Sequence, residues 1–377
     1  MNINKKLIYK TLLTIVGVII LAVGGLMAYL AIPSGFQSRQ AEGPKVLTEL
    51  LKMAQESQPF NPDPYISSTY RPGDPLYEPL LYIQRHRQGK AEELLHPLVE
   101  QGNADAMYWL AQITYDDSYY SSGPAAKLFQ KSAELGNPYA ALRLDSNNRE
   151  CQMFMSGYCD QKWGKLGRKL LQERAEKGDK KAEYYLLQYD EDSSEEVHKE
   201  LERLVTENAK NHYYQPLEKL LTDYFGNWHM PFLDRDKPLG KRKKLLLSEL
   251  IKIAADNNYI PAINMVFQYK KLFKSDYIHI NLIKILNLGG DLIHCQNYYI
   301  NKSRKNREEI IDGTSCAIAK DYIRGEDSEM LIFNFSLKKN KLDKLTSEEL
   351  QKAEIRAQKI IKEMTPMIYI DEMNPRP

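Results

Sequence analysis

The sequence predicts an all-α protein: a right-handed α/α superhelical solenoid of about five to seven helical-pair repeats, after one N-terminal transmembrane helix. Three observations predict it: a long uncharged apolar run near the N-terminus, a turn pattern that recurs at intervals of about 34 residues or more, and an ordinary globular composition. The chain has 377 residues, of which 43% are hydrophobic and 27% charged, so it can bury a substantial core.

The apolar run covers residues 11–32 and carries no charge. A helix of this length spans roughly 33 Å, enough to cross a hydrocarbon layer of about 30 Å. Three lysines lie in residues 1–10, and the first basic residue after the run is Arg39. The positive-inside rule then predicts a single-pass protein of the bacterial inner membrane, with residues 1–10 in the cytoplasm and the C-terminal domain in the periplasm. The alternative is a cleaved signal peptide, which is usually shorter and ends in a small-residue cleavage site.

Residues 33–79 contain eight of the 18 prolines and predict an extended spacer, because proline removes an amide donor and restricts the residue before it. One short helix interrupts the spacer, since apolar residues recur at helical spacing at Val46, Leu47, Leu50, Leu51 and Ala54.

Residues 80–364 carry the repeats. Turn positions at 102, 136, 178, 212 and 258 are separated by 34, 42, 34 and 46 residues, which is a period of 34 with one insertion of 8 and one of 12. Glycine at a turn can adopt the left-handed conformation that ends the first helix of a pair, and asparagine is the next-best residue there. A small alanine four residues later lets the second helix approach the first closely. The repeat-defining residues are Gly102, Ala106, Gly136, Ala140, Gly178, Ala182, Asn258 and Ala262.

Further signals mark the helix ends. Asn103, Asn137 and Asp179 follow their turns directly and are expected to cap the second helix of each pair. His212 replaces glycine in the fourth copy. Residues 290–294 suggest a degenerate copy, and residues 318–325 suggest another second helix. Residues 345–364 predict a capping helix with a Thr346/Glu349 capping box, and residues 365–377 form a C-terminal tail.

The four cysteines form two neighbouring sets, Cys151 with Cys159 and Cys295 with Cys316, so two local disulfides are expected. The alternative is four unrelated buried thiols, because spacing does not prove connectivity. Neither spacing is typical of structural zinc.

The recurring residues resemble a known family. Residues 133–144 read A-E-x-G-N-x-x-A-x-x-x-L, residues 318–325 read I-A-x-x-Y-x-x-G, and residues 345–353 read L-T-S-E-E-L-Q-K-A. These patterns are similar to the Sel-one-like repeats, a branch of the tetratricopeptide-like helical-pair solenoids. The resemblance implies an α/α superhelix that binds proteins through its concave face and has no catalytic activity by itself.

No enzymatic chemistry stands out. The seven histidines form no compact ligand set, and no nucleophile elbow or phosphate-binding loop occurs, so we predict no catalytic residues, cofactor or metal. His294 beside Cys295 is expected to be structural. The net charge of +2 argues against nucleic-acid binding. Tyrosine doublets at 119–120, 184–185, 213–214 and 298–299 predict helix packing, with a minority facing the groove.

The sequence therefore predicts a non-catalytic solenoid that binds a protein partner in its concave groove and contacts the membrane through its N-terminal helix. Membrane-anchored relatives of this repeat family resemble immunity proteins that neutralise toxic effectors, such as phospholipases delivered by type VI secretion. This resemblance makes an immunity protein the leading hypothesis. The alternatives are a scaffold or adaptor for the assembly or quality control of membrane proteins and, less favoured, an envelope hydrolase hidden in the insertions.

Overall fold

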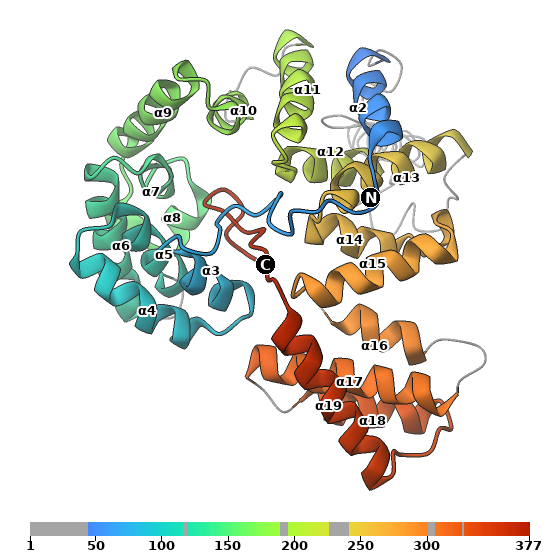
Figure 1. Ribbon diagram of the computed structural model, residues 1–377. Coiled ribbons are helices and arrows are strands. Elements are labelled where there is room, and N and C mark those ends of the chain that lie inside the picture. Colours follow the sequence, from blue (N-terminus) through green and yellow to red (C-terminus); the bar gives the residue numbers. More distant parts are fainter. Residues whose placement is uncertain are drawn as a thin grey trace, which may run out of the picture.

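The computed structural model describes residues 44–115, 119–188, 195–225, 241–290, 292–300, 306–325 and 328–377. Within these ranges the chain is helical and has no strand, which confirms the all-α prediction. Consecutive helices pack against one another, and together they form an arc around a centre (Figure 1). The architecture is that of a helical-repeat solenoid.

The described residues contain seven helical pairs joined by short turns. They are α4 (Gln88–Glu100) with α5 (Ala104–Thr114), α6 (Tyr119–Glu134) with α7 (Pro138–Arg143), α9 (Gln161–Glu176) with α10 (Lys180–Gln188), α11 (Glu195–Lys210) with α12 (Gln215–Phe225), α13 (Lys241–Asp256) with α14 (Ile260–Gln268), α15 (Ser275–Asn287) with α16 (Ile293–Ile300), and α17 (Arg307–Arg324) with α18 (Glu329–Lys339). The helix α3 (Tyr77–Gln84) precedes the pairs and α19 (Ser347–Glu363) follows them, while α2 (Pro44–Glu56) packs on α13 and α11.

The turns share one local device. The turn residue has a positive φ, from 59° at His212 to 96° at Gly136. At every turn from Gly102 to Gly289, the next residue donates its N–H to the carbonyl five positions earlier, as Asn103 does to Leu98 at 3.0 Å. This bond closes the first helix and starts the second at once. The other turn residues are Gly102, Gly178, Asn258, Gly289 and Gly325.

The second helices begin with the caps that the sequence predicts. The side chains of Asn103, Asn137 and Asp179 each accept a backbone N–H from the residue three positions later. The four repeat-defining alanines, Ala106, Ala140, Ala182 and Ala262, are at most 2% exposed. The capping box of Thr346 and Glu349 at the start of α19 is also confirmed.

Two sequence-based assignments need correction. Residues 318–325 are not a second helix: they are the end of α17, which is the first helix of its pair and ends at the left-handed Gly325. The degenerate copy suggested at 290–294 has its turn one residue earlier, at Gly289, where φ is 69°. The eight-residue insertion after α7 corresponds to the short helix α8 (Arg149–Phe154) and a 3-10 turn at residues 156–158.

Both disulfides are present, Cys151–Cys159 around α8 and Cys295–Cys316 between α16 and α17. Their connectivity follows the local pairing expected from the sequence. The aromatic face of Phe267 stacks on His294, with the ring centroids 4.8 Å apart, which agrees with a structural role for that histidine.

The apolar core has two large parts, one under α3–α9 and one under α10–α15. Residues 365–377, here called the tail, join them: Ile368 and Ile370 belong to the first part, and Met367 to the second. The tail and the segment 57–76, here called the N-terminal segment, cross the centre of the arc (Figure 1). The proline-rich region is therefore not a free spacer over these residues, because it packs inside the fold.

The expected location in a membrane needs correction. In the described part of the chain, no helix combines the length and apolar character needed to cross a bilayer. The prediction of a single-pass inner-membrane protein with a periplasmic domain is therefore not supported. The apolar run at residues 11–32, on which that prediction was based, lies outside the described residues, as does most of the 12-residue insertion near 226–240.

Candidate functional site

The concave side of the arc binds an extended polypeptide, and that polypeptide is the chain's own tail. Gln84 of α3 donates to the carbonyl of Met367 at 2.9 Å and accepts the N–H of Tyr369 at 2.8 Å. From the other part of the core, Gln215 of α12 donates to the carbonyl of Tyr369 at 2.6 Å. Because the tail backbone has no helix or sheet of its own, these side chains satisfy its buried polar groups.

The N-terminal segment lies beside the tail. The Thr69 N–H donates to the carbonyl of Ile368 at 2.9 Å, and the Thr69 hydroxyl donates to that of Ile370 at 2.7 Å. The Ile368 N–H in turn donates to the hydroxyl of Ser68. Two segments about 300 positions apart in sequence thus fill the middle of the concave face together.

An acidic pair anchors the tail to the inner helices. The Lys181 ammonium of α10 lies 2.8 Å from Asp371 and 3.0 Å from Glu372. The Asp371 side chain is fully buried and also accepts the hydroxyl proton of Tyr213, which bonds to the hydroxyl of Tyr185. Burial opposes the charged form of Asp371, but the adjacent Lys181 outweighs it and holds the pKa of the carboxyl below its ordinary value.

The same pair acts on Lys181 in the opposite sense. Burial alone would lower the pKa of the ammonium, yet Asp371 and Glu372 raise it well above its ordinary value. Both partners are therefore charged at neutral pH, and the ion pair is enclosed by tyrosines. Tyr185 and Tyr213, which come from the tyrosine doublets at 184–185 and 213–214, form hydrogen bonds with Asn374 and Asp371 of the tail.

The end of the tail reaches the disulfide-closed insertion. Arg376 donates to the hydroxyl of Tyr115 at 2.7 Å and pairs with Glu150 of α8 at 3.1 Å. Burial would raise the pKa of Glu150, but Arg143 and Arg376 lower it below its ordinary value. The insertion thus has a structural contact with the centre of the arc.

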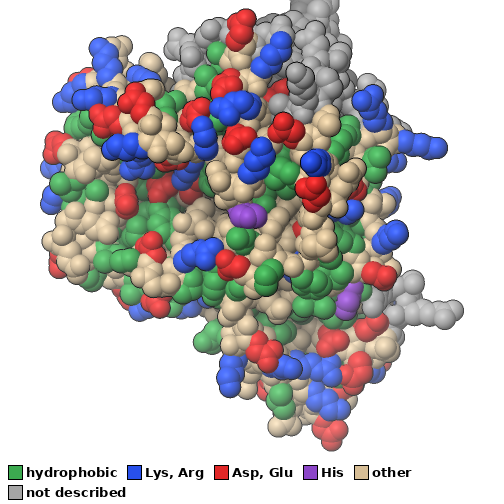
Figure 2. Space-filling model, turned by 45° about the horizontal axis from the view of Figure 1, so that its top comes forward, with side chains coloured by type: hydrophobic (Ala, Val, Ile, Leu, Met, Phe, Trp, Pro, Cys, Tyr) green, Lys and Arg blue, Asp and Glu red, His purple; other side chains and the backbone are tan. Residues whose placement is uncertain are grey.

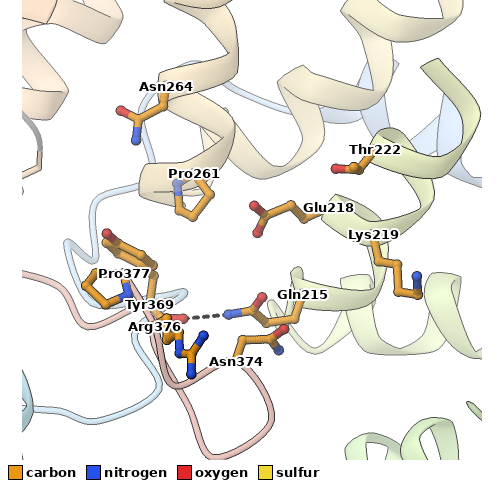
Figure 3. Close-up of a pocket in the computed structure, with 10 residues that line it drawn as sticks. All are labelled: Gln215, Glu218, Lys219, Thr222, Pro261, Asn264, Tyr369, Asn374, Arg376 and Pro377. Atoms are coloured by element: carbon orange, nitrogen blue, oxygen red, sulfur yellow. Dashed lines mark hydrogen bonds between the residues drawn. The ribbon is translucent and has the colours of Figure 1, made fainter. Parts of the chain in front are cut away.

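Beside the tail, a hollow of about 430 Å³ remains open; we call it the central hollow (Figure 3). Its walls come from α12, α14 and the tail. A second space of about 240 Å³ adjoins it and shares Glu218, Thr222, Pro261 and Asn264. The residues around the central hollow are Gln215, Glu218, Lys219, Thr222, Pro261, Asn264, Tyr369, Asn374, Arg376 and Pro377.

Two polar groups in this hollow are suited to an incoming partner. The Oδ1 atom of Asn264 is buried and has no hydrogen-bond partner, which is costly unless a ligand or water supplies one. Burial raises the pKa of Glu218, against a hydrogen bond from Tyr259 at 2.5 Å that lowers it. Figure 3 shows Glu218 directed toward the space between α12 and α14.

Among the described residues, no three His, Cys, Asp or Glu side chains are grouped so that they could hold a metal ion. Figure 2 shows acidic and basic side chains interspersed over the visible face, in keeping with the near-neutral net charge.

Sequence reasoning did not identify the tail contacts. The available signal was the apolar run Met367–Ile370, which is unusual for a solvated tail, directly followed by the acidic pair. Lys181 sits one position before the repeat alanine Ala182, and nothing in its own repeat distinguishes it from other lysines.

Comparison with known proteins adds little to this geometry. No protein-family model matches the chain, and no curated protein matches it. One solved structure, a protective antigen of uropathogenic Escherichia coli displaying an SLR fold, is similar at 18% identity with a TM-score of 0.36. The match covers 77% of this chain and 61% of that protein, and at this TM-score it carries no argument about function.

Proposed function

We propose that the chain is a non-catalytic protein-binding solenoid whose partner docks on the concave side, over the central hollow. Within the helical-repeat architecture, we propose the right-handed superhelix of the Sel-one-like repeats. The observation that carries the proposal is the bound tail: this face already holds an extended polypeptide by hydrogen bonds to its backbone and by a buried ion pair.

A partner would add to this surface without replacing the tail. Met367, Ile368 and Ile370 are fully buried, so displacing them would expose much of the junction between the two core parts. The central hollow is open beside them, and Glu218 is directed into the space between α12 and α14 (Figure 3).

Within this class, we propose an immunity protein that neutralises a toxic effector, of the phospholipase type or another type VI effector. Insertions that break the repeat spacing support this finer proposal, because they give one solenoid a surface that its neighbours in the family need not share. The disulfide-closed α8 is one such insertion, and the tail contacts it through Arg376.

The test is co-expression of this chain with the toxic effector encoded beside its gene. We expect a stable complex and protection of the host cell. Thr222→Arg, which places a long cation in the hollow, should weaken the complex at least about tenfold, whereas Gln172→Arg on the exposed side of α9 should not. Toxicity that is unchanged by the wild-type chain would reject the immunity assignment. A complex that Thr222→Arg leaves intact would reject the proposed docking surface.

A further inference from the structure

The two ends of the arc meet at another cavity, distinct from the two described above, with a volume of about 230 Å³; we call it the junction cavity. It lies between the end of α3, the turn from α15 to α16, and the end of α17. The two ends lie close together: a Cβ atom on Gly325 would stand 3.1 Å from Nε of Arg87. The Arg85 guanidinium reaches the sulfur of Met364 at 3.4 Å.

The walls of this cavity carry positive charge without acidic side chains. Its charged or titratable lining residues, tyrosine aside, are Arg85, His86, Lys320 and Arg324, and none of the lining side chains is a carboxylate. Lys320 is neutralised by Glu329 at 3.0 Å, and both are almost fully buried. In the described part of the chain, neither Arg85 nor Arg324 forms an ion pair with a carboxylate.

Arg85 is the least satisfied of these groups. Its Nε atom is buried and has no hydrogen-bond partner, and its only other polar contact is the weak one to the Met364 sulfur. Burial lowers the pKa of Arg85, and this effect outweighs the opposing influence of the nearby Tyr77 and Tyr82. An anion that accepted two hydrogen bonds from the guanidinium would remove this deficit.

The helix ends supply only part of the missing charge. The C-termini of α3 and α17 both lie at the cavity, and each carries about half a negative charge from its helix dipole. These partial charges compensate the two arginines only in part.

We propose that the junction cavity is a binding site for an oxyanion, a carboxylate or phosphate group, held between Arg85, which follows α3, and Arg324 at the end of α17. The planar guanidinium fork of arginine matches two oxygens of either group, and lysine would not supply this geometry. A cavity of this size is large enough for a phosphate ion or for one acidic side chain. The source is thus either a free small anion or the acidic side chain of a bound polypeptide.

An anion bound at this site would also stabilise the closed arc. Arg85 follows α3, which precedes the first pair, and Arg324 ends α17 of the last pair, so an anion held by both would bridge the two ends of the solenoid. The proposal does not depend on the proposed protein partner, because a free anion could occupy the site alone.

The experiment is calorimetric titration of the full chain at pH 7 and fixed ionic strength, with inorganic phosphate in one arm and acetyl-glutamate amide in the other. We expect saturable binding in at least one arm. Both Arg85→Gln and Arg324→Gln should weaken it at least about tenfold, whereas Lys169→Gln, at an exposed position on α9, should leave it unchanged.

The two arms separate the sources: binding of phosphate alone identifies a free anion, and binding of the glutamate probe identifies an acidic side chain. Absence of saturable binding in both arms would overturn the proposal, as would equal affinity in the variants and the wild type. If Arg85→Gln fails to fold by circular dichroism, Arg324→Gln decides the test, because its side chain is only half-buried.

Discussion

Replacing Lys181 by methionine tests whether the tail is an integral part of the fold. The ammonium lies 2.8 Å from Asp371 and 3.0 Å from Glu372, and the Asp371 side chain has no exposed surface. Removing one member of a buried ion pair costs about 3–5 kcal/mol, because the other charge stays desolvated. Asp371 would keep the hydrogen bonds from Tyr213 and from the backbone N–H of Asn374, so we expect the lower end, about 3 kcal/mol.

The measurement is urea unfolding followed by far-ultraviolet circular dichroism, at pH 7. The matched control is Lys169→Met, whose partner Glu173 is 3.9 Å away with both side chains largely exposed, and which should cost less than about 0.5 kcal/mol. Adding Asp371→Asn to Lys181→Met should recover part of the loss, because the amide is neutral. If Lys181→Met costs no more than the control, the buried ion pair does not stabilise the tail.

The pH dependence gives a second readout of the same pair. The pKa of Asp371 is lower in the folded chain than its unfolded value of about 3.9, so its contribution is complete above pH 4 and is lost as the pH falls through the folded pKa. In Lys181→Met the carboxyl stays buried without its cation, so its pKa is raised, and the difference in stability between wild type and variant should shrink as the pH falls from above 4 through the folded pKa of the wild type. A difference that stays constant down to pH 2 would contradict the assignment.

Three further predictions test other contacts. Gly164→Ala should cost about 2 kcal/mol of stability in thermal unfolding, because its Cβ would lie 2.0 Å from a carboxylate oxygen of the buried Asp145. Gly89→Ala has open space and should stabilise the chain by up to about 1 kcal/mol, and equal effects of the two substitutions would refute this reasoning. Asn258→Gly should destabilise the chain by about 1 kcal/mol, because the Asn258 amide donates to two carbonyls of the N-terminal segment. His212→Gly should be neutral or stabilising, because it replaces a non-glycine residue of left-handed conformation, and destabilisation by both substitutions would contradict this difference. Burial lowers the pKa of Lys284 to about 8, so its side-chain ¹³C signal should titrate there, and a midpoint near pH 10.5 would exclude this environment. The contribution of Lys284 to stability should rise between about pH 8 and pH 10.5, because the folded chain then binds fewer protons than the unfolded chain.

The sequence by itself determined the parts of this protein that depend on near neighbours. A turn residue, its cap and the alanine that follows lie within about five positions of one another, and their hydrogen bonds close inside the same segment. The pattern at Gly102, Gly136 and Gly178 therefore predicted helices and turns correctly. The two disulfides join cysteines 8 and 21 positions apart, so local pairing was enough to predict them.

The incorrect assignment arose where one residue pattern fits more than one position in a repeat. Residues 318–325 carry the ending of a repeat helix, but glycine ends first helices as well, so the motif did not define the register. At Asn258 the sequence accounted only for the left-handed turn. The structure gives the side chain a second role, since its amide donates to two carbonyls of the N-terminal segment.

Only the tertiary structure decided what occupies the concave face. Thr69 and Ile368 are 299 positions apart, and Lys181 and Glu372 are 191 apart, in segments with no periodicity to reveal a partner. The apolar run Met367–Ile370 indicates that the tail is buried, but it does not indicate which helices cover it. Its place is fixed by the groove that the stacked helices create, by the side chains they direct inward, and by a charge on one element that is stable in the interior only beside the opposite charge on the other.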